Sequence, residues 1–169
     1  MHLIVDGYNV IRQSPSLQLL DAMDLQAGRE ALLESLAHYR RRSHHQITVV
    51  FDGWQHGDLK ESRDRYQGIL VIYSRRGERA DEVMKRLLTQ ERERTLVVTS
   101  DREIQVCAEQ AKAAWINAGE FELSHLQDPS GAADPDAEAD SSVRGTHKKG
   151  PARRLSKRLR QRQQRLKKL

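Results

Sequence analysis

The sequence predicts an α/β domain in which helices flank a doubly wound, mostly parallel central sheet. Short apolar runs alternate along the chain with longer segments that carry helical periodicity. Each run is continuously apolar, which is typical of strands that are buried on both faces of a parallel sheet. With 169 residues, the chain is long enough to form one domain with a substantial core.

Five apolar runs are the expected strands, at residues 3–5, 47–51, 69–73, 96–100 and 114–116. The first, second and fourth runs are each followed directly by an aspartate, namely Asp6, Asp52 and Asp101. The third run leads instead into a Ser-Arg-Arg-Gly turn. Ligands of doubly wound sheets bind outside the carboxyl ends of the strands, so the three aspartates are expected to converge there.

Three helices are expected between these strands. Apolar residues recur at helical spacing in residues 25–39, 83–88 and 104–111. Cys107 falls on the apolar face of the last segment and is expected to be a core residue. Asp81 lies at the start of the middle helix, so it is either a helix N-cap, which contributes about 1 kcal/mol, or a fourth site carboxylate.

A cluster of aspartates needs a cation or raised pKa values. Two carboxylates about 5 Å apart repel each other by roughly 3 kcal/mol at an effective dielectric constant of 20. Oxygen ligands without nearby Cys or His favour Mg²⁺ or Mn²⁺. A single strand-terminal aspartate can equally be a turn residue whose carboxylate accepts backbone N–H groups, and this alternative stays open for each aspartate alone.

The chain divides into three parts by composition. Residues 144–169 carry 12 Lys and Arg residues and no acid, whereas the preceding chain carries 17 basic and 24 acidic residues. We therefore expect a globular domain at residues 1–126, an acidic flexible linker at 127–143 and a basic tail at 144–169. One cysteine excludes an intramolecular disulfide, and neither a signal peptide nor a membrane span is visible, so a cytoplasmic location is expected.

Four ordered motifs resemble those of the YacP-like NYN-domain proteins, which belong to the PIN-like nuclease group. The motifs are Val-Asp-Gly-Tyr-Asn-Val-Ile at 5–11, Val-Phe-Asp-Gly at 50–53, Gly-Glu-Arg-Ala-Asp-Glu at 77–82 and Val-Thr-Ser-Asp-Arg at 98–102. The resemblance covers about residues 1–126. It implies a PIN-like three-layer α/β/α fold and a metal-dependent endoribonuclease that hydrolyses RNA.

The family's acidic site carries over to named positions of this chain. The resemblance implies that Asp6 and Asp101 are direct ligands of Mg²⁺ or Mn²⁺, that Asp81 binds directly or through water, and that Asp52 is a further ligand. Asn9 is expected to orient a carboxylate or a metal-bound water. Such ions can activate water and neutralise a phosphate during hydrolysis.

Two basic segments are candidates for nucleic-acid binding. Arg75, Arg76 and Arg79 flank the Asp81 segment, although a solvated charged loop is the competing interpretation. The tail candidates are Lys148, Lys149, Arg153, Arg154, Lys157 and Arg158. The tail is expected to be disordered or to become helical on RNA or a ribosomal surface, with a membrane-surface helix or an unspecific solubilising tail as alternatives.

Other functions remain open at this level. An RNA-binding module that has lost turnover and a structure-specific DNA nuclease both fit the same motifs. A phosphatase of the Asp-x-Asp type is disfavoured because Tyr8 stands two positions after Asp6. The sequence leaves the RNA target and the oligomeric state undetermined.

Deleting residues 144–169 should weaken RNA binding and flatten its salt dependence, because the basic residues are concentrated there. Each phosphate contact on a single strand contributes about 0.7 to the slope of log affinity against log salt, so six contacts give a slope near −4. Metal-dependent cleavage of short RNAs should persist at high enzyme concentration. A salt slope that the deletion leaves unchanged would refute this role of the tail.

Overall fold

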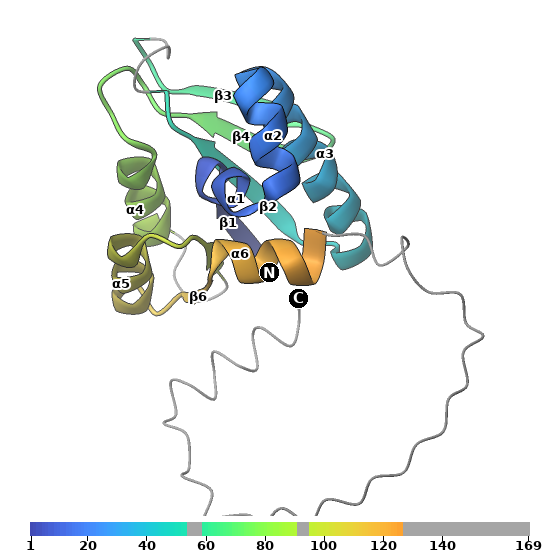
Figure 1. The fold of residues 1–169 in the computed structure, drawn as a ribbon. Coiled ribbons are helices and arrows are strands. Elements are labelled where there is room, and N and C mark those ends of the chain that lie inside the picture. Colours follow the sequence, from blue (N-terminus) through green and yellow to red (C-terminus); the bar gives the residue numbers. More distant parts are fainter. Residues whose placement is uncertain (54–58, 91–94, 127–169) are drawn as a thin grey trace, which may run out of the picture.

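The computed structural model describes residues 1–53, 59–90 and 95–126, and these form a six-stranded sheet between two layers of helices (Figure 1). This confirms the predicted three-layer α/β/α fold. The expected linker at 127–143 and basic tail at 144–169 lie outside the described residues, so the domain boundaries stay a prediction.

The sheet is mostly parallel, with one antiparallel edge. Its strands are β1 (His2–Asp6), β2 (Gln46–Phe51), β3 (Ser62–Tyr66), β4 (Ile69–Tyr73), β5 (Thr95–Val98) and β6 (Ala114–Ile116). Their order is β3-β4-β2-β1-β5-β6, and only the β3–β4 pairing is antiparallel. The carboxyl ends of the five parallel strands therefore meet at one edge, with β1 near the middle.

Helices cover both faces of the sheet. They are α1 (Gly7–Gln13), α2 (Pro15–Met23), α3 (Leu25–Ser43), α4 (Ala80–Gln90), α5 (Arg102–Gln110) and α6 (Ala118–Phe121), followed by the π-helical turn η1 (Glu122–Leu126). The three helices expected from periodicity correspond to α3, α4 and α5. None of the described helices is long and apolar enough to cross a membrane.

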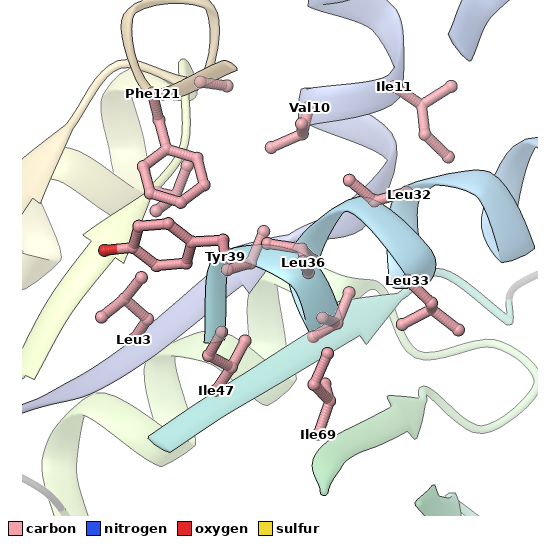
Figure 2. Packing of buried hydrophobic residues seen from close by; sticks show 14 of the residues in the cluster. Leu3, Val10, Ile11, Leu32, Leu33, Leu36, Tyr39, Ile47, Ile69 and Phe121 are labelled. Carbon is pink, nitrogen blue, oxygen red and sulfur yellow. The ribbon is translucent and has the colours of Figure 1, made fainter. Parts of the chain in front are cut away.

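Two apolar cores explain why the strands are apolar at consecutive positions. Alternate residues of each central strand face opposite sides, as Leu3 and Ile4 do in β1. One side packs against α1, α2, α3 and α6, where Tyr39 and Phe121 meet edge to face with ring centroids 5.4 Å apart (Figure 2). The other side packs against α4 and α5, and half-buried Cys107 lies against that core.

The sequence did not predict β3, because its pattern is polar and its three central residues are exposed. The turn that joins β3 to β4 is the feature that marks it. Gln67 and Gly68 both have positive φ angles, of 45° and 83°, which suits a tight two-residue hairpin. The short helices α1 and α2 were also not predicted, although Pro15 at the start of α2 is a typical first helical residue.

Candidate acidic site at the carboxyl edge of the sheet

Asp6 ends strand β1 and caps helix α1 at the same time. Its Oδ1 accepts a hydrogen bond from the backbone N–H of Asn9 at 3.1 Å, as an N-cap carboxylate does. Only 7% of the residue is exposed. Asp6 is therefore a helix cap, as the alternative interpretation of a strand-terminal aspartate held. As the last residue of β1, it also lies at the carboxyl edge of the sheet, where the site was predicted.

A hydrogen-bond network joins Asp6 to the segment that follows β5. The Asn9 amide donates from Nδ2 to Asp6 Oδ2 at 3.2 Å, while its Oδ1 accepts from the Ser100 backbone N–H at 3.2 Å. The Thr99 hydroxyl donates to Asp6 Oδ2 at 3.3 Å and accepts from the Asp101 backbone N–H at 3.1 Å. Asn9 therefore links the Asp6 carboxylate to the segment after β5, while its role in a catalytic site stays a prediction.

Asp101 caps α5 in the way that Asp6 caps α1. Its Oδ1 accepts the backbone N–H groups of Glu103 at 2.7 Å and of Ile104 at 3.4 Å. Its Oδ2 accepts no hydrogen bond from the residues that the structure describes. One oxygen of this half-buried carboxylate is thus fixed by the helix, and the other remains available to a ligand.

Asp81 is the second residue of α4, so it is not the N-cap of that helix. Its side chain is 17% exposed, and Arg79 Nη2 lies 3.8 Å from its Oδ2. Burial raises the pKa of Asp81, Arg79 lowers it, and the charge of Asp101 raises it again. The effect of Asp101 means that these two carboxylates lie within electrostatic reach of each other.

Burial is also the main reason why the pKa of Asp6 is raised to about 6 from its ordinary 3.8. The hydrogen bonds from Asn9 lower this pKa, the charge of Asp81 raises it, and the hydrogen bond from Thr99 lowers it. The charge of Asp81 therefore raises the pKa of Asp6, and the charge of Asp101 raises the pKa of Asp81. Asp81 on α4 thus lies within electrostatic reach of Asp6 at the end of β1 and of Asp101, the N-cap of α5.

Asp52 lies to one side of this group. It directly follows β2, is half-buried, and precedes Gly53, whose backbone N–H donates to Ser74 Oγ at 2.9 Å. Burial raises the pKa of the Tyr8 phenol, hydrogen bonding to Arg29 lowers it, and the charges of Asp21 and Asp52 raise it further. The charge of Asp52 thus raises the pKa of Tyr8, whereas the role of Asp52 as a metal ligand stays a prediction.

The three aspartates fit a hard divalent cation as oxygen donors, but they do not enclose one. Among the described residues, no three His, Cys, Asp or Glu side chains form a group that could hold a metal ion by themselves. Mg²⁺ commonly keeps several waters and uses one or two carboxylates together with substrate phosphates. The donor set is therefore suited to an ion that substrate oxygens help to bind.

Buried Glu78 stabilises the loop that carries the three predicted RNA-binding arginines, Arg75, Arg76 and Arg79. Its carboxylate accepts from Arg86 Nη1 at 2.7 Å and lies 3.4 Å from Arg75 Nε. The Ser74 hydroxyl donates to the backbone carbonyl of Glu78 at 2.7 Å. The predicted RNA-binding residue Arg75 is thus exposed but ion-paired, and the sequence reasoning did not identify Glu78 or Arg86 as its partners.

The remaining loop arginines differ in their surroundings. Arg76 is exposed at the turn that contains Gly77. Arg79 is 67% exposed and reaches back toward Asp81. Both are accessible to a phosphate beside the acidic group, while their part in RNA binding stays a prediction.

A three-layer α/β/α domain with aspartates at the carboxyl edge of its parallel strands is the arrangement that the resemblance to the PIN-like nuclease group implies. The chain matches the family model described as YacP-like NYN domain over residues 3–168, and it belongs to this family. The match extends beyond residue 126, where the motif resemblance ended, and into the basic tail.

Proteins of similar sequence and structure support this family assignment. The chain is 32% identical to YacP of Bacillus subtilis (strain 168) over 85 residues, which are 50% of this chain and 49% of that protein. The match thus spans about half the length of that relative. Two crystal structures of Rae1 (YacP) from Bacillus subtilis, one of them of a mutant, have TM-scores of 0.56 and 0.61. They are 27% and 28% identical to this chain and cover 73% of it and 72% of their own chains.

Replacing Asp6 by Asn should stabilise the metal-free protein at pH 7, because a costly buried charge is removed while asparagine still caps the helix. A pKa of about 6 instead of 3.8 corresponds to roughly 3 kcal/mol of unfolding free energy. The folded wild type holds a proton that the unfolded chain has released between these pH values. Its stability therefore falls as pH rises through this window.

Urea unfolding in EDTA at several pH values measures this effect. Asp6→Asn should be more stable than wild type by about 1–3 kcal/mol at pH 7 and lack most of the fall between pH 4 and 6. The matched control is Asp24→Asn, because Asp24 caps α3 through the Gln26 N–H but is exposed. An Asp6→Asn variant that is less stable than wild type at pH 7 would show that the hydrogen bonds which Asn9 and Thr99 donate to the second carboxylate oxygen outweigh the cost of burying the charge.

Proposed function

We propose that this protein is a metal-dependent endoribonuclease that hydrolyses RNA phosphodiester bonds at the carboxyl edge of its sheet. The observation that carries this proposal is the grouping of Asp6, Asp81 and Asp101, in which the most buried carboxylate has a pKa raised to about 6. Membership of a family in the PIN-like nuclease group supports the same reaction class.

Asp6, Asp81 and Asp101 would hold Mg²⁺ or Mn²⁺, with Asp52 as a further ligand. A bound ion of this kind supplies an activated water and neutralises charge on the phosphate. Asn9 and Thr99 hold the Asp6 carboxylate in one orientation from two different segments of the chain. A fixed first ligand reduces the reorganisation that binding and catalysis require.

Basic groups beside the site would bind the RNA backbone. Arg76 and Arg79 present exposed guanidinium groups near Asp81, and Arg75 adds a third while it remains paired with Glu78. The basic segment at 144–169 would add affinity for RNA or for a ribosomal surface through its phosphates. In this proposal the carboxylates bind the metal ion, and the basic side chains bind the RNA.

A second function is favoured by one observation. Both oxygens of the Asp6 carboxylate already accept hydrogen bonds from the protein, three in total. This satisfies the buried group without a metal, as an RNA-binding module without turnover requires. A DNA nuclease would use the same acids, so the two substrates have to be compared directly.

Cleavage of a labelled single-stranded RNA in Mg²⁺ or Mn²⁺, with EDTA as reference, tests the proposal. Asp6→Asn and Asp101→Asn should each lower turnover by at least about a hundredfold, since even the loss of an outer hydrogen-bond partner of a metal ligand typically costs about ten- to a hundredfold in metal affinity or activity. RNA binding should largely survive in both variants. Asp24→Asn should cleave like wild type, because it removes a cap carboxylate that lies outside the acidic group.

Two results would contradict the proposal in different ways. Near-normal turnover by both site variants would remove these aspartates from the reaction. Wild-type protein that binds RNA but cleaves neither RNA nor DNA of the same sequence with either metal would be the inactive module.

A further inference from the structure

A second charged group lies at the same edge of the sheet and is not used by the acidic site. Arg29, on helix α3, has its guanidinium carbon 5.4 Å from the ring centroid of Tyr8, 5.7 Å from that of Phe51 and 5.5 Å from that of Tyr73. The three rings come from α1, β2 and β4. Such packing against aromatic rings stabilises a cation that is partly removed from water.

Among the described residues, the direct contacts of Arg29 are with the aromatic side chains of Tyr8, Phe51 and Tyr73, while the charges of Asp21 and Asp52 reach Tyr8 from a greater distance. Arg29 Nε donates to the Tyr8 phenol oxygen at 2.7 Å, and Nη2 donates to the same oxygen. A guanidinium has five N–H donors, so one neutral acceptor leaves part of the fork available. A half-buried arginine whose protein partners are all uncharged is suited to an external anion, and phosphate matches its fork geometry.

The position of the guanidinium is fixed by the sheet. Phe51 is fully buried, stacks on Tyr73 at a centroid distance of 5.5 Å and meets Tyr8 edge to face at 5.4 Å. Gly7 makes room for the Phe51 ring, since a Cβ atom there would lie 2.3 Å from Phe51 Cε1. The rings therefore form a rigid support, and Arg29 needs little ordering before it binds an anion.

This support adjoins the acidic site along the chain and across the sheet. Tyr8 stands two residues after Asp6, and Phe51 directly precedes Asp52. In the sheet register Asp6 is opposite Val50, and Phe51 is opposite Tyr73. Arg29 thus flanks the aspartates on the β2–β4 side, whereas Asp81 and Asp101 lie toward α4 and α5.

We propose that Arg29 binds a phosphate of the RNA backbone and holds the strand across the acidic site, with Tyr8 orienting its guanidinium. This inference rests on the proposed function and adds a substrate-positioning residue to it. A polyanion that approaches three aspartates is repelled unless a fixed cation holds it in register, since phosphate contacts set the position of a nucleic acid. The competing role for Arg29 is purely structural, as a cation that supports the three rings.

Binding of a fluorescent single-stranded RNA to the full chain in EDTA, over a range of salt concentrations, separates these roles. Arg29→Met keeps an apolar side chain of similar length on the rings but removes the charge. Loss of one phosphate contact should reduce the magnitude of the salt slope by about 0.7, which is about a fivefold loss of affinity at 0.1 M salt. Arg29→Lys should keep the wild-type slope, because the ammonium group retains the charge.

Arg41→Met is the matched control. Arg41 is an exposed arginine near the other end of α3, where it donates to the Gln67 side chain at 3.0 Å. Its variant should keep both the affinity and the salt slope of wild type. If Arg29→Met does not fold, as judged by far-UV circular dichroism, Arg29→Gln takes its place in the same titration.

The outcomes distinguish this inference from the proposed function. A folded Arg29 variant with wild-type affinity and salt slope would overturn the phosphate-binding role, even if the protein cleaves RNA. A selective loss of one contact in a protein that never cleaves RNA would support Arg29 and refute the nuclease activity. Wild-type protein that does not bind the RNA in EDTA would overturn the role of Arg29 as a binding group.

Discussion

A carboxylate at the end of a strand that is buried on both faces is the constraint on which the edge of this sheet depends. Asp6 cannot be charged there without compensation, because desolvation raises its pKa to about 6. Three hydrogen bonds from Asn9 and Thr99 offset part of this cost. Since Thr99 follows β5, the compensation also ties the two strands' carboxyl ends together, and it brings Asp101 into the same region.

The charge pattern around Asp6 has two sides. Toward α4 and α5, the charge of Asp81 raises the pKa of Asp6 and the charge of Asp101 raises the pKa of Asp81, while Arg79 lies 3.8 Å from Asp81 and lowers its pKa. Toward β2 and β4, Arg29 lies on three aromatic rings and donates its hydrogen bonds to the neutral phenol of Tyr8. In the proposed function, a metal ion would bind the carboxylates on one side of Asp6, and an RNA phosphate would bind Arg29 on the other.

The sequence predicted the elements that show as patterns of neighbouring residues. It did not predict side-chain contacts between residues that are far apart along the chain. Continuous apolar runs predicted the parallel strands, and their ends predicted that Asp6 and Asp101 lie at the same edge of the sheet. Edge strand β3 was missed because its residues are polar and its three central positions are exposed, so only its turn marks it. Thr99 resembled an ordinary strand residue and Arg29 an ordinary helix residue. Their partners are 93 and 21 residues away in the sequence, so only the fold reveals them.

The pKa of Asp6 in the folded protein, with and without Mg²⁺, tests most directly whether this carboxylate is held for a cation. A pH titration of its side-chain carboxyl carbon by NMR gives that value for one residue, and the Asp6→Asn spectrum identifies the resonance. Metal-free protein should titrate near pH 6, and saturating Mg²⁺ should move the midpoint well below that value, because the ion favours the charged form. A midpoint that stays near 6 when Mg²⁺ is added, or that lies near the ordinary 3.8 without it, would contradict the account.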